Sequence, residues 1–496
     1  MGKVKKFLCL EKIKLSVNDY LLLLLPIVVW FSYHPLIEFG QTDTMYLEIS
    51  LTLIVLTLFS VTALPHIWRS CQKIIKNKLY WLVIGFGVWN TLSLLWTENL
   101  LRGCLTAGLV WLLVIAFLRI ITHPKIKELL PALFKIFVIS AVLVSIFAWI
   151  QMVLDIIGVP LEGSLMCIGC QFEYFGFPRA TAFAIEPQFF GSLLLAPILL
   201  LIALGYKVKV KYPHYILIVF LVLTLFMTLS RGAIYALFIG TVLLLILNYK
   251  KMKQSLLTIG LIFISFLLSL AAQGFMVINN PQVNESFGFS IAKSVNHLSL
   301  GVIDFRDNIV EFEQKINTKE EKSEDKNKNE AKNDISTSSK KKENDNIYFD
   351  GYVAESTDAR LSFNELAYDA WKESAFSMFF GVGLGSAGIA MHNTYPDQIG
   401  PLEITQNEYT EIMLELGLVG FIFFAALLVI FLYKTKREKW TWVILAAFLT
   451  QWMFFSGYPN AIHIYLVLFI LIKLALTQPR ETKKSFDNYQ IFGKIA

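Results

Sequence analysis

Charged residues and cysteines are both scarce in this chain of 496 residues. Only 17% of the residues are charged, against about a quarter in an average soluble protein, whereas 55% are hydrophobic and the mean hydropathy is +0.57. Such a chain has too little polar surface to cover a globule of its size, which excludes a soluble multidomain protein. The composition predicts a polytopic membrane protein, and the formal charge of +6 does not indicate a nucleic-acid partner.

The five cysteines are too few for a disulfide scaffold, and neither paired CxxC motifs nor HExxH occurs, so we expect no metal site and no cofactor. Cys167 and Cys170 form the pair CIGC, on the outer side by the topology argued below. A small-loop disulfide is our interpretation there. Redox catalysis lacks a thioredoxin-like setting, and zinc would need two further ligands.

Long apolar runs make up most of the chain. A spanning helix needs about 20 apolar residues, and the run from 212 to 249 would be roughly 57 Å long as one helix, so we divide it at Ser230-Arg231-Gly232. The first run has no small-residue cleavage site and is expected to span the membrane. The resulting twelve predicted spans are 18–38, 45–67, 79–97, 103–121, 132–155, 183–205, 213–230, 232–249, 255–276, 409–433, 440–456 and 460–477.

Lysine and arginine are distributed unevenly between alternate connections. Clusters of them occupy every second connection and both ends of the chain, whereas the intervening short connections carry Arg102, Arg179 and Arg231 alone. By the positive-inside rule the clusters are cytoplasmic. We therefore expect an all-α integral membrane protein with about 12 transmembrane helices, multi-pass in the bacterial cytoplasmic (inner) membrane, with both termini in the cytoplasm.

One connection, between helices 9 and 10, is much longer than the others and lies on the outer (periplasmic or extracellular) face by parity. Within it, residues 317–346 are low-complexity and mixed in charge, which predicts a disordered insert without chemistry. Residues near 359–380 have the spacing of an amphipathic helix. The predicted domains are an N-terminal membrane domain of about nine spans (1–276), the outer loop (277–408), a C-terminal membrane domain of about three spans (409–477) and a basic cytoplasmic tail (478–496).

Three of the arginines on the side of the membrane that the positive-inside rule disfavours stand out. Arg179 precedes the sixth span, Arg231 separates two apolar runs, and Arg360 opens the amphipathic segment. A guanidinium stays charged and presents a planar fork of donors that suits phosphate oxygens, so we interpret the three as an anion site. The alternatives are that Arg231 snorkels to the outer headgroups and that Arg360 is an ordinary solvated loop residue.

Several groups could act as a general base. Glu186 lies about one turn inside the sixth span and is either a base or an ion-pair partner of Arg179. His392, followed by Asn393 in the long loop, is the histidine candidate, although a lone loop histidine is usually only solvated. The nearby sequence GVGLGSAG (381–388) lacks the βαβ context of a nucleotide loop and is interpreted as a flexible turn.

A further group of polar residues leads into the tenth span. Asn407 and Glu408 are followed by Glu411 and Glu415 at helical spacing, which puts the three glutamates on one face. Glu408 is a candidate base and Asn407 a candidate site residue. The alternative is that these carboxylates only interact favourably with the dipole at a helix N-terminus.

Four segments, in this order, resemble the O-antigen ligase and polymerase superfamily of bacterial membrane glycosyltransferases. Together they cover roughly residues 170–425 and read FGFPRATAFAIEPQFFGSLLLA, MTLSRGAIYALFIG, ARLSFNELAYDAWKESAFSMFFGVGLGSAG and QNEYTEIMLELGLVGFIFF. The resemblance implies transfer of a glycan from a polyprenyl-pyrophosphate lipid, on the outer face, to an acceptor sugar or glycolipid. It places Arg179, Arg231 and Arg360 near the pyrophosphate, where arginines can neutralise the leaving group without a metal.

The chain departs from the ligase pattern at one position. Ligases of this family resemble one another in having His-Asn where this chain has Gln406-Asn407, and glutamine cannot act as a base. We therefore favour a polymerase of surface polysaccharide (O-antigen, capsule or exopolysaccharide repeat units) over a ligase that transfers the glycan to lipid A-core. His392, Glu408 or Glu186 would then supply the base.

The expected partners are the lipid-linked donor, the acceptor, a flippase and chain-length regulator proteins. A different class stays open, because a lipid-linked oligosaccharide flippase or another secondary transporter also has about twelve spans. Such transporters often show internal repeats. The two halves of this chain show no convincing similarity, and the long outer loop favours the glycosyltransferase interpretation.

Overall fold

Our computed structural model describes most of the chain. Cys167, Cys170, the insert 317–346 and the tail 478–496 lie outside the described residues. The described residues are 14–42, 45–76, 78–159, 161, 175–184, 186–207, 212–280, 286–300, 302–303, 352–401, 403–436 and 438–476.

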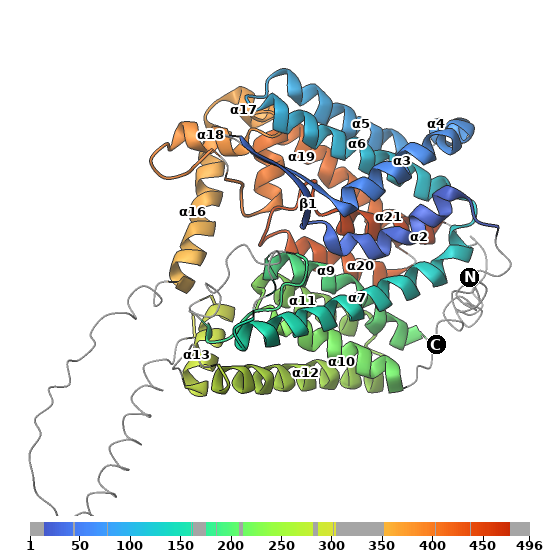
Figure 1. Ribbon diagram of the computed structural model, residues 1–496. Coiled ribbons are helices and arrows are strands. Elements are labelled where there is room, and N and C mark those ends of the chain that lie inside the picture. The colour runs from blue at the N-terminus through green and yellow to red at the C-terminus, as the bar shows by residue number, and fades with distance from the viewer. Residues whose placement is uncertain are drawn as a thin grey trace, which may run out of the picture.

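The described part of the chain is mostly helical, and its long helices run side by side in one bundle (Figure 1). Seven of them are long and apolar enough to cross a membrane: α3 (Leu51–Arg69), α5 (Lys78–Leu92) with η2 (Ser93–Leu95), α6 (Leu100–Thr122), α7 (Ile126–Ile156), α9 (Pro187–Lys207), α12 (Met252–Ile278) and α19 (Glu408–Thr435). Shorter apolar helices complete the bundle: α2 (Val17–Val28) with η1 (Val29–Phe31), α10 (Tyr212–Met227), α11 (Arg231–Leu247), α20 (Lys439–Gln451) and α21 (Ile462–Leu476).

The remaining helices lie at the ends of the bundle. The short helix α4 (Cys71–Ile75) stands at one end. Towards the opposite end lie α13 (Phe287–Leu298), α16 (Tyr352–Lys372), α17 (Ala375–Phe380) and α18 (Ala387–Thr394), on the left of Figure 1. Every one of these four belongs to the segment predicted to form the long outer loop.

A β-hairpin corrects the all-α prediction. Strands β1 (Pro35–Thr42) and β2 (Met45–Ser50) pair antiparallel, with Glu38 opposite Glu48, so the predicted spans 18–38 and 45–67 are wrong at these ends. Proline cannot continue a helix interior because it lacks the amide hydrogen. Gly40 adopts a φ of 113°, which is also incompatible with a helix. Apolarity alone did not distinguish a strand from the end of a span.

The amphipathic segment forms two helices where one was predicted near 359–380. Helix α16 ends at Lys372, and Ser374 is the N-cap of α17. Its hydroxyl accepts a hydrogen bond from the Ser377 amide at 3.0 Å. On α16, Leu366 and Ala370 are buried and pack against Met391 of α18 and Leu414 of α19. This contact fixes α16 and α18 against the first turns of α19.

The predicted break in the run 212–249 is confirmed. Helix α10 ends at Met227 and α11 begins at Arg231, with Leu229 in the connection at a φ of +48°, an unusual value for a residue other than glycine. The C-terminal helices then pack among the N-terminal ones, α20 against α11 and α21 against α6. The core is therefore built from both ends of the sequence.

Candidate active site

The turn between α10 and α11 positions Arg231. Ser230 is the N-cap of α11 and its hydroxyl accepts a hydrogen bond from the Ala233 amide at 3.4 Å. Arg231 follows directly and is only 3% exposed. A Cβ added to Gly191 would lie 2.7 Å from the Ala233 Cβ, so α9 and α11 begin in close contact. The arginine is thus held at a helix N-terminus, inside the bundle.

Arg179 lies on the other side of the same turn. The neighbouring amide of Ala180 donates to the carbonyl of Met227 at 3.1 Å. The guanidinium lies 5.3 Å from the centre of the Phe175 ring, and its buried Nε has no hydrogen-bond partner. Ala182, close by, adopts a φ of +50°. Left-handed conformations at residues other than glycine carry strain that often marks functional sites, and here two of them, at 182 and 229, flank the arginines.

Glu408 is the most enclosed of the candidate bases, with no exposed surface. Its amide donates to the Trp452 carbonyl at 3.0 Å. One carboxylate oxygen, Oε2, accepts from the Gly457 amide at 2.6 Å, and the other, Oε1, accepts from the Tyr465 hydroxyl at 2.8 Å. The connection between α20 and α21 therefore wraps around this carboxylate and fixes its orientation.

Glu186 lies near Glu408, and Tyr33 connects them. The Tyr33 hydroxyl is buried, makes no hydrogen bond to any residue that the structure describes, and interacts electrostatically with both carboxylates. Its ring stacks on Phe189 with the ring centres 4.2 Å apart. Glu186 itself accepts a hydrogen bond from the Gln188 amide at 2.5 Å. Because Glu186 is hydrogen-bonded to Gln188, we do not favour the alternative in which it forms an ion pair with Arg179.

Residues 451–454, at the end of α20, bring Glu408 and Arg231 to one place. A Cβ added to Gly232 would lie 2.7 Å from the Phe454 Cβ and 3.2 Å from the Gln451 Nε2. Trp452, in the same stretch, holds the Glu408 amide. Gln451 is completely buried, and within the described part of the chain both polar atoms of its side chain lack hydrogen-bond partners. One short stretch of chain, residues 451–454, thus contacts the residue after Arg231 and the Glu408 backbone and also contributes the side-chain amide of Gln451.

Glu411 and Glu415 form a second acidic cluster beside the first. Glu411 accepts from the amide and hydroxyl of Thr405 at 3.1 and 2.6 Å, and Glu415 accepts from the Ala387 amide at 3.4 Å. Arg102 lies near enough to interact electrostatically with both carboxylates. These glutamates are buried, so the dipole interpretation accounts for only part of their role.

The glycine-rich segment 381–388 is a packed structural element and not a free turn. Gly417 breaks α19 with a φ of +65°, which releases carbonyls from the helical pattern. The carbonyls of residues 414, 415 and 416 then accept from the Val382 amide at 2.9 Å, the Gly383 amide at 3.1 Å and the Trp89 indole at 3.0 Å. A buried helix break needs such partners, and the glycine segment provides two of the three.

The other predicted site residues have more local surroundings. Asn407 is the N-cap of α19, with its Oδ1 accepting from the Tyr409 amide at 2.8 Å. The Nδ1 of His392 bonds the carbonyl of Ile399 at 2.7 Å, so this nitrogen carries the hydrogen and Nε2 keeps a lone pair. Arg360 lies on α16 one turn before Asn364, whose Oδ1 accepts from the Thr410 hydroxyl at 3.0 Å. Its side chain lies outside the described residues.

Sequence reasoning missed Tyr33, Tyr465, Gln451 and the role of Arg102. Arg102 did carry a signal, because it is an arginine on an outer connection like Arg179 and Arg231. The other three are single polar residues in apolar runs without periodicity or motif. Only the packing of α20 and α21 against α11 and α19 identifies them.

Comparison with known families gives one match. A family model described as O-antigen ligase matches residues 216–425, which confirms the resemblance to the O-antigen ligase and polymerase superfamily. The matched range begins within α10 and ends within α19, and it includes Arg231, Arg360, His392 and Glu408. A search of curated proteins finds no match. The match covers less than half of the chain, and together with the apolar helices it indicates a similarity to multi-pass bacterial membrane proteins of the ligase or polymerase type.

Proposed function

Because residues 216–425 match the O-antigen ligase family, we propose that this protein is a glycosyltransferase that polymerises surface polysaccharide from polyprenyl-pyrophosphate-linked repeat units. The single observation that carries the proposal is the meeting of three groups. Arg179 and Arg231 flank one strained turn, and the end of α20 links that turn to the buried, hydrogen-bonded carboxylate of Glu408. Cationic donors and a base are the two requirements of this reaction.

The proposed reaction is a single displacement at the anomeric carbon of the donor. The acceptor hydroxyl oxygen attacks that carbon and forms the new glycosidic bond. The bond between the anomeric carbon and the pyrophosphate oxygen breaks, and the lipid pyrophosphate leaves with the electron pair. Arg179 and Arg231 stabilise the negative charge that develops on it, with Arg360 as a third candidate. The hydroxyl proton passes to the base.

We propose Glu408 as that base. Two donors orient its carboxylate, and it lies next to the residues that pack against the Arg231 turn. Glu186 is the second choice because Tyr33 places it near the same point. His392 is the third: its free Nε2 is suited to accept a proton, but its described contacts are with α18 and the loop that follows.

Polymerase remains our preference over ligase. Gln406 stands where ligases resemble one another in having histidine, and a base taken from Glu408 makes that histidine unnecessary. We further propose the cytoplasmic membrane as the location, with both termini inside. The charge pattern predicts that α4 is cytoplasmic and that α13, α16, α17 and α18 are outside. These four helices lie towards the opposite end of the bundle from α4, which supports this topology (Figure 1).

The decisive experiment is to delete the gene in its host, analyse the surface polysaccharide by gel electrophoresis, and restore either the wild type or a variant. If the protein is a polymerase, deletion collapses long chains to a single repeat unit. Arg231→Ala and Arg179→Ala should each reduce transfer by about 10²- to 10³-fold, because each removes a donor from the leaving group. Arg69→Ala is the control, since Arg69 is exposed in α3.

Protein level in the membrane must be measured for each variant. Arg231→Lys keeps the charge but loses the planar fork, and we expect it to retain only part of the activity. Full activity of Arg231→Ala at normal protein level would remove that residue from the mechanism. Lipid A-core without any attached glycan in the deletion strain would indicate a ligase. An unchanged distribution of polysaccharide chain lengths on the gel would indicate a transporter.

A further inference from the structure

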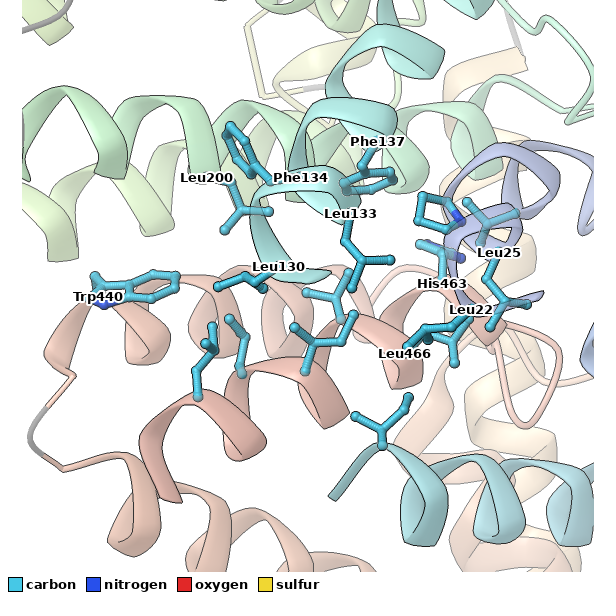
Figure 2. A pocket seen from close by; sticks show the side chains of 17 residues that line it. Leu22, Leu25, Leu130, Leu133, Phe134, Phe137, Leu200, Trp440, His463 and Leu466 are labelled. Atoms are coloured by element: carbon cyan, nitrogen blue, oxygen red, sulfur yellow. The ribbon is translucent and has the colours of Figure 1, made fainter. Parts of the chain in front are cut away.

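An apolar groove lies between helices from both ends of the sequence. Its cavity volume is about 100 Å³, and it is lined by residues of α2, η1, α6, α7, α9, α20 and α21. Almost all of these residues are Leu, Ile, Val, Phe or Pro. Figure 2 shows Trp440 at one end and His463 at the other, with Leu130 and Leu133 between them. On α21 the two ends are separated by 11 residues, from 463 to 474, or roughly 16 Å of helix axis.

The two ends of the groove differ in exposure. At the His463 end, Leu22, Leu25 and Leu466 are between 1% and 7% exposed. At the other end, Trp440 and Leu474 are half-buried. These lining residues are more buried at the His463 end, called the closed end below, than at the Trp440 end, where we expect a chain to leave the protein and continue into the bilayer.

His463 is a polar group in this apolar lining. It is 2% exposed, its Nε2 lies 3.0 Å from the Ser192 hydroxyl, and its Nδ1 has no hydrogen-bond partner among the described residues. A serine hydroxyl can donate to Nε2, which leaves a hydrogen on Nδ1. A purely hydrocarbon occupant would leave that nitrogen unsatisfied. An occupant with an oxygen at this end would satisfy it.

The closed end of the groove adjoins the candidate active site. The ring centres of His463 and Tyr33 are 6.2 Å apart, and Tyr33 interacts electrostatically with Glu408 and Glu186. Tyr465, two residues after His463, donates directly to the Glu408 carboxylate. A lipid in the groove would therefore bring its polar head to the candidate active site, where Arg179 and Arg231 are proposed to bind the pyrophosphate, and keep its tail in the apolar part.

We propose that the groove binds the first isoprene units of the polyprenyl tail of the donor lipid, with His463 at the junction between tail and pyrophosphate. This inference rests on the proposed function and assigns part of its substrate site. A lipid glycan donor has both parts that the groove requires: an apolar chain for the lining and phosphate oxygens for His463.

The test compares two donors that carry the same host glycan, one on its native long polyprenyl pyrophosphate and one on a two-isoprene geranyl pyrophosphate. Wild-type protein should prefer the long donor by at least about tenfold in kcat/KM, since more apolar surface is buried. Leu133→Trp fills the middle of the groove and should lower kcat/KM for the long donor by at least about tenfold, which removes the preference. Leu143→Trp is the matched control on α7, because Leu143 is 60% exposed.

A photo-crosslinking amino acid at Leu130, with Leu143 as control position, gives a readout that does not depend on activity. The groove position should crosslink to the lipid-linked glycan. Two outcomes would overturn the proposal that the groove binds the donor lipid while the proposed function stands. One is an active wild-type protein that crosslinks only to phospholipid, and the other is an unchanged donor preference in Leu133→Trp. Crosslinking to the lipid-linked glycan without transfer from either donor would overturn the proposed function and not the groove.

Discussion

At the scale of single residues, Glu408 is the group whose surroundings depart most from what its sequence position suggests. A glutamate at the start of a helix is usually explained by the helix dipole. Here the carboxylate is fully buried and both oxygens accept hydrogen bonds, from the Gly457 amide and the Tyr465 hydroxyl. An oriented, enclosed carboxylate is better explained by a role as the general base than by the helix dipole alone.

Glu408→Gln should therefore reduce transfer on the order of 10²- to 10⁴-fold, the usual contribution of a general base. The measurement is the rate of glycan transfer at equal protein level in membranes. Glu403→Gln is the control, because Glu403 is an exposed glutamate just before the same helix. Tyr465→Phe removes one of the two orienting bonds and should cause a smaller loss. Near-wild-type transfer by Glu408→Gln would move the base to Glu186 or His392.

At the scale of elements, the broken helix α19 depends on the glycine segment that docks against it. Gly381 adopts a φ of +80°, and a Cβ there would lie 2.3 Å from the Glu415 carbonyl oxygen. Gly417 and Gly381 approach each other so closely that either Cβ would meet the backbone of the other segment. No side chain fits between the two segments, so both positions require glycine.

Gly381→Ala should lower stability by about 1 to 3 kcal/mol from the strained backbone alone, and by more from the steric clash. Gly400→Ala is the matched control, because a Cβ at Gly400 would meet nothing within 4 Å. The apparent unfolding midpoint in detergent distinguishes the two variants. If Gly381→Ala has the same apparent unfolding midpoint as wild type and the control, the contact between the glycine segment and α19 does not stabilise α19.

At the scale of the whole molecule, a buried network joins the ends of α2 and α6 at the start of α7. The Lys125 amide donates to the His123 Nδ1 at 3.2 Å, so Nε2 carries the hydrogen and donates to Asp19 Oδ1 at 2.7 Å. Arg119 donates to the Asn18 side chain at 2.6 Å. The neutral form of His123 satisfies both of its bonds. A proton on Nδ1 would break the first.

Burial and the nearby Arg119 lower the pKa of His123 to about 4 from its ordinary 6.5. A lowered histidine pKa means that stability is fully present above pH 6.5 and is lost as the pH falls towards 4. At about 1.4 kcal/mol per pKa unit the loss is ~3 kcal/mol. His123→Gln should remove this part of the pH dependence of unfolding. A variant that loses stability as steeply as wild type between pH 6.5 and 4 would show that other groups are responsible.

The sequence alone determined the membrane class, most of the helices and the break at Arg231. These follow from local quantities: apolar run length, the placement of lysine and arginine, and the fixed rise of a helix. The same local signals wrongly assigned part of the β-hairpin to transmembrane spans, because Leu36, Ile37 and Phe39 are as apolar as the residues of a span. They also gave Arg179, Arg231, Glu186 and Glu408 as separate candidates without showing that they meet.

Only the tertiary structure decided which of these residues form one site. Tyr33 from the N-terminal part of the chain and Gln451 and Tyr465 from the C-terminal part reach the same place, because α20 packs on α11 and the connection after α20 wraps around Glu408. The groove arises in the same way, between helices at both ends of the sequence. Contacts between distant segments depend on side-chain packing in three dimensions, which no pattern along one chain records.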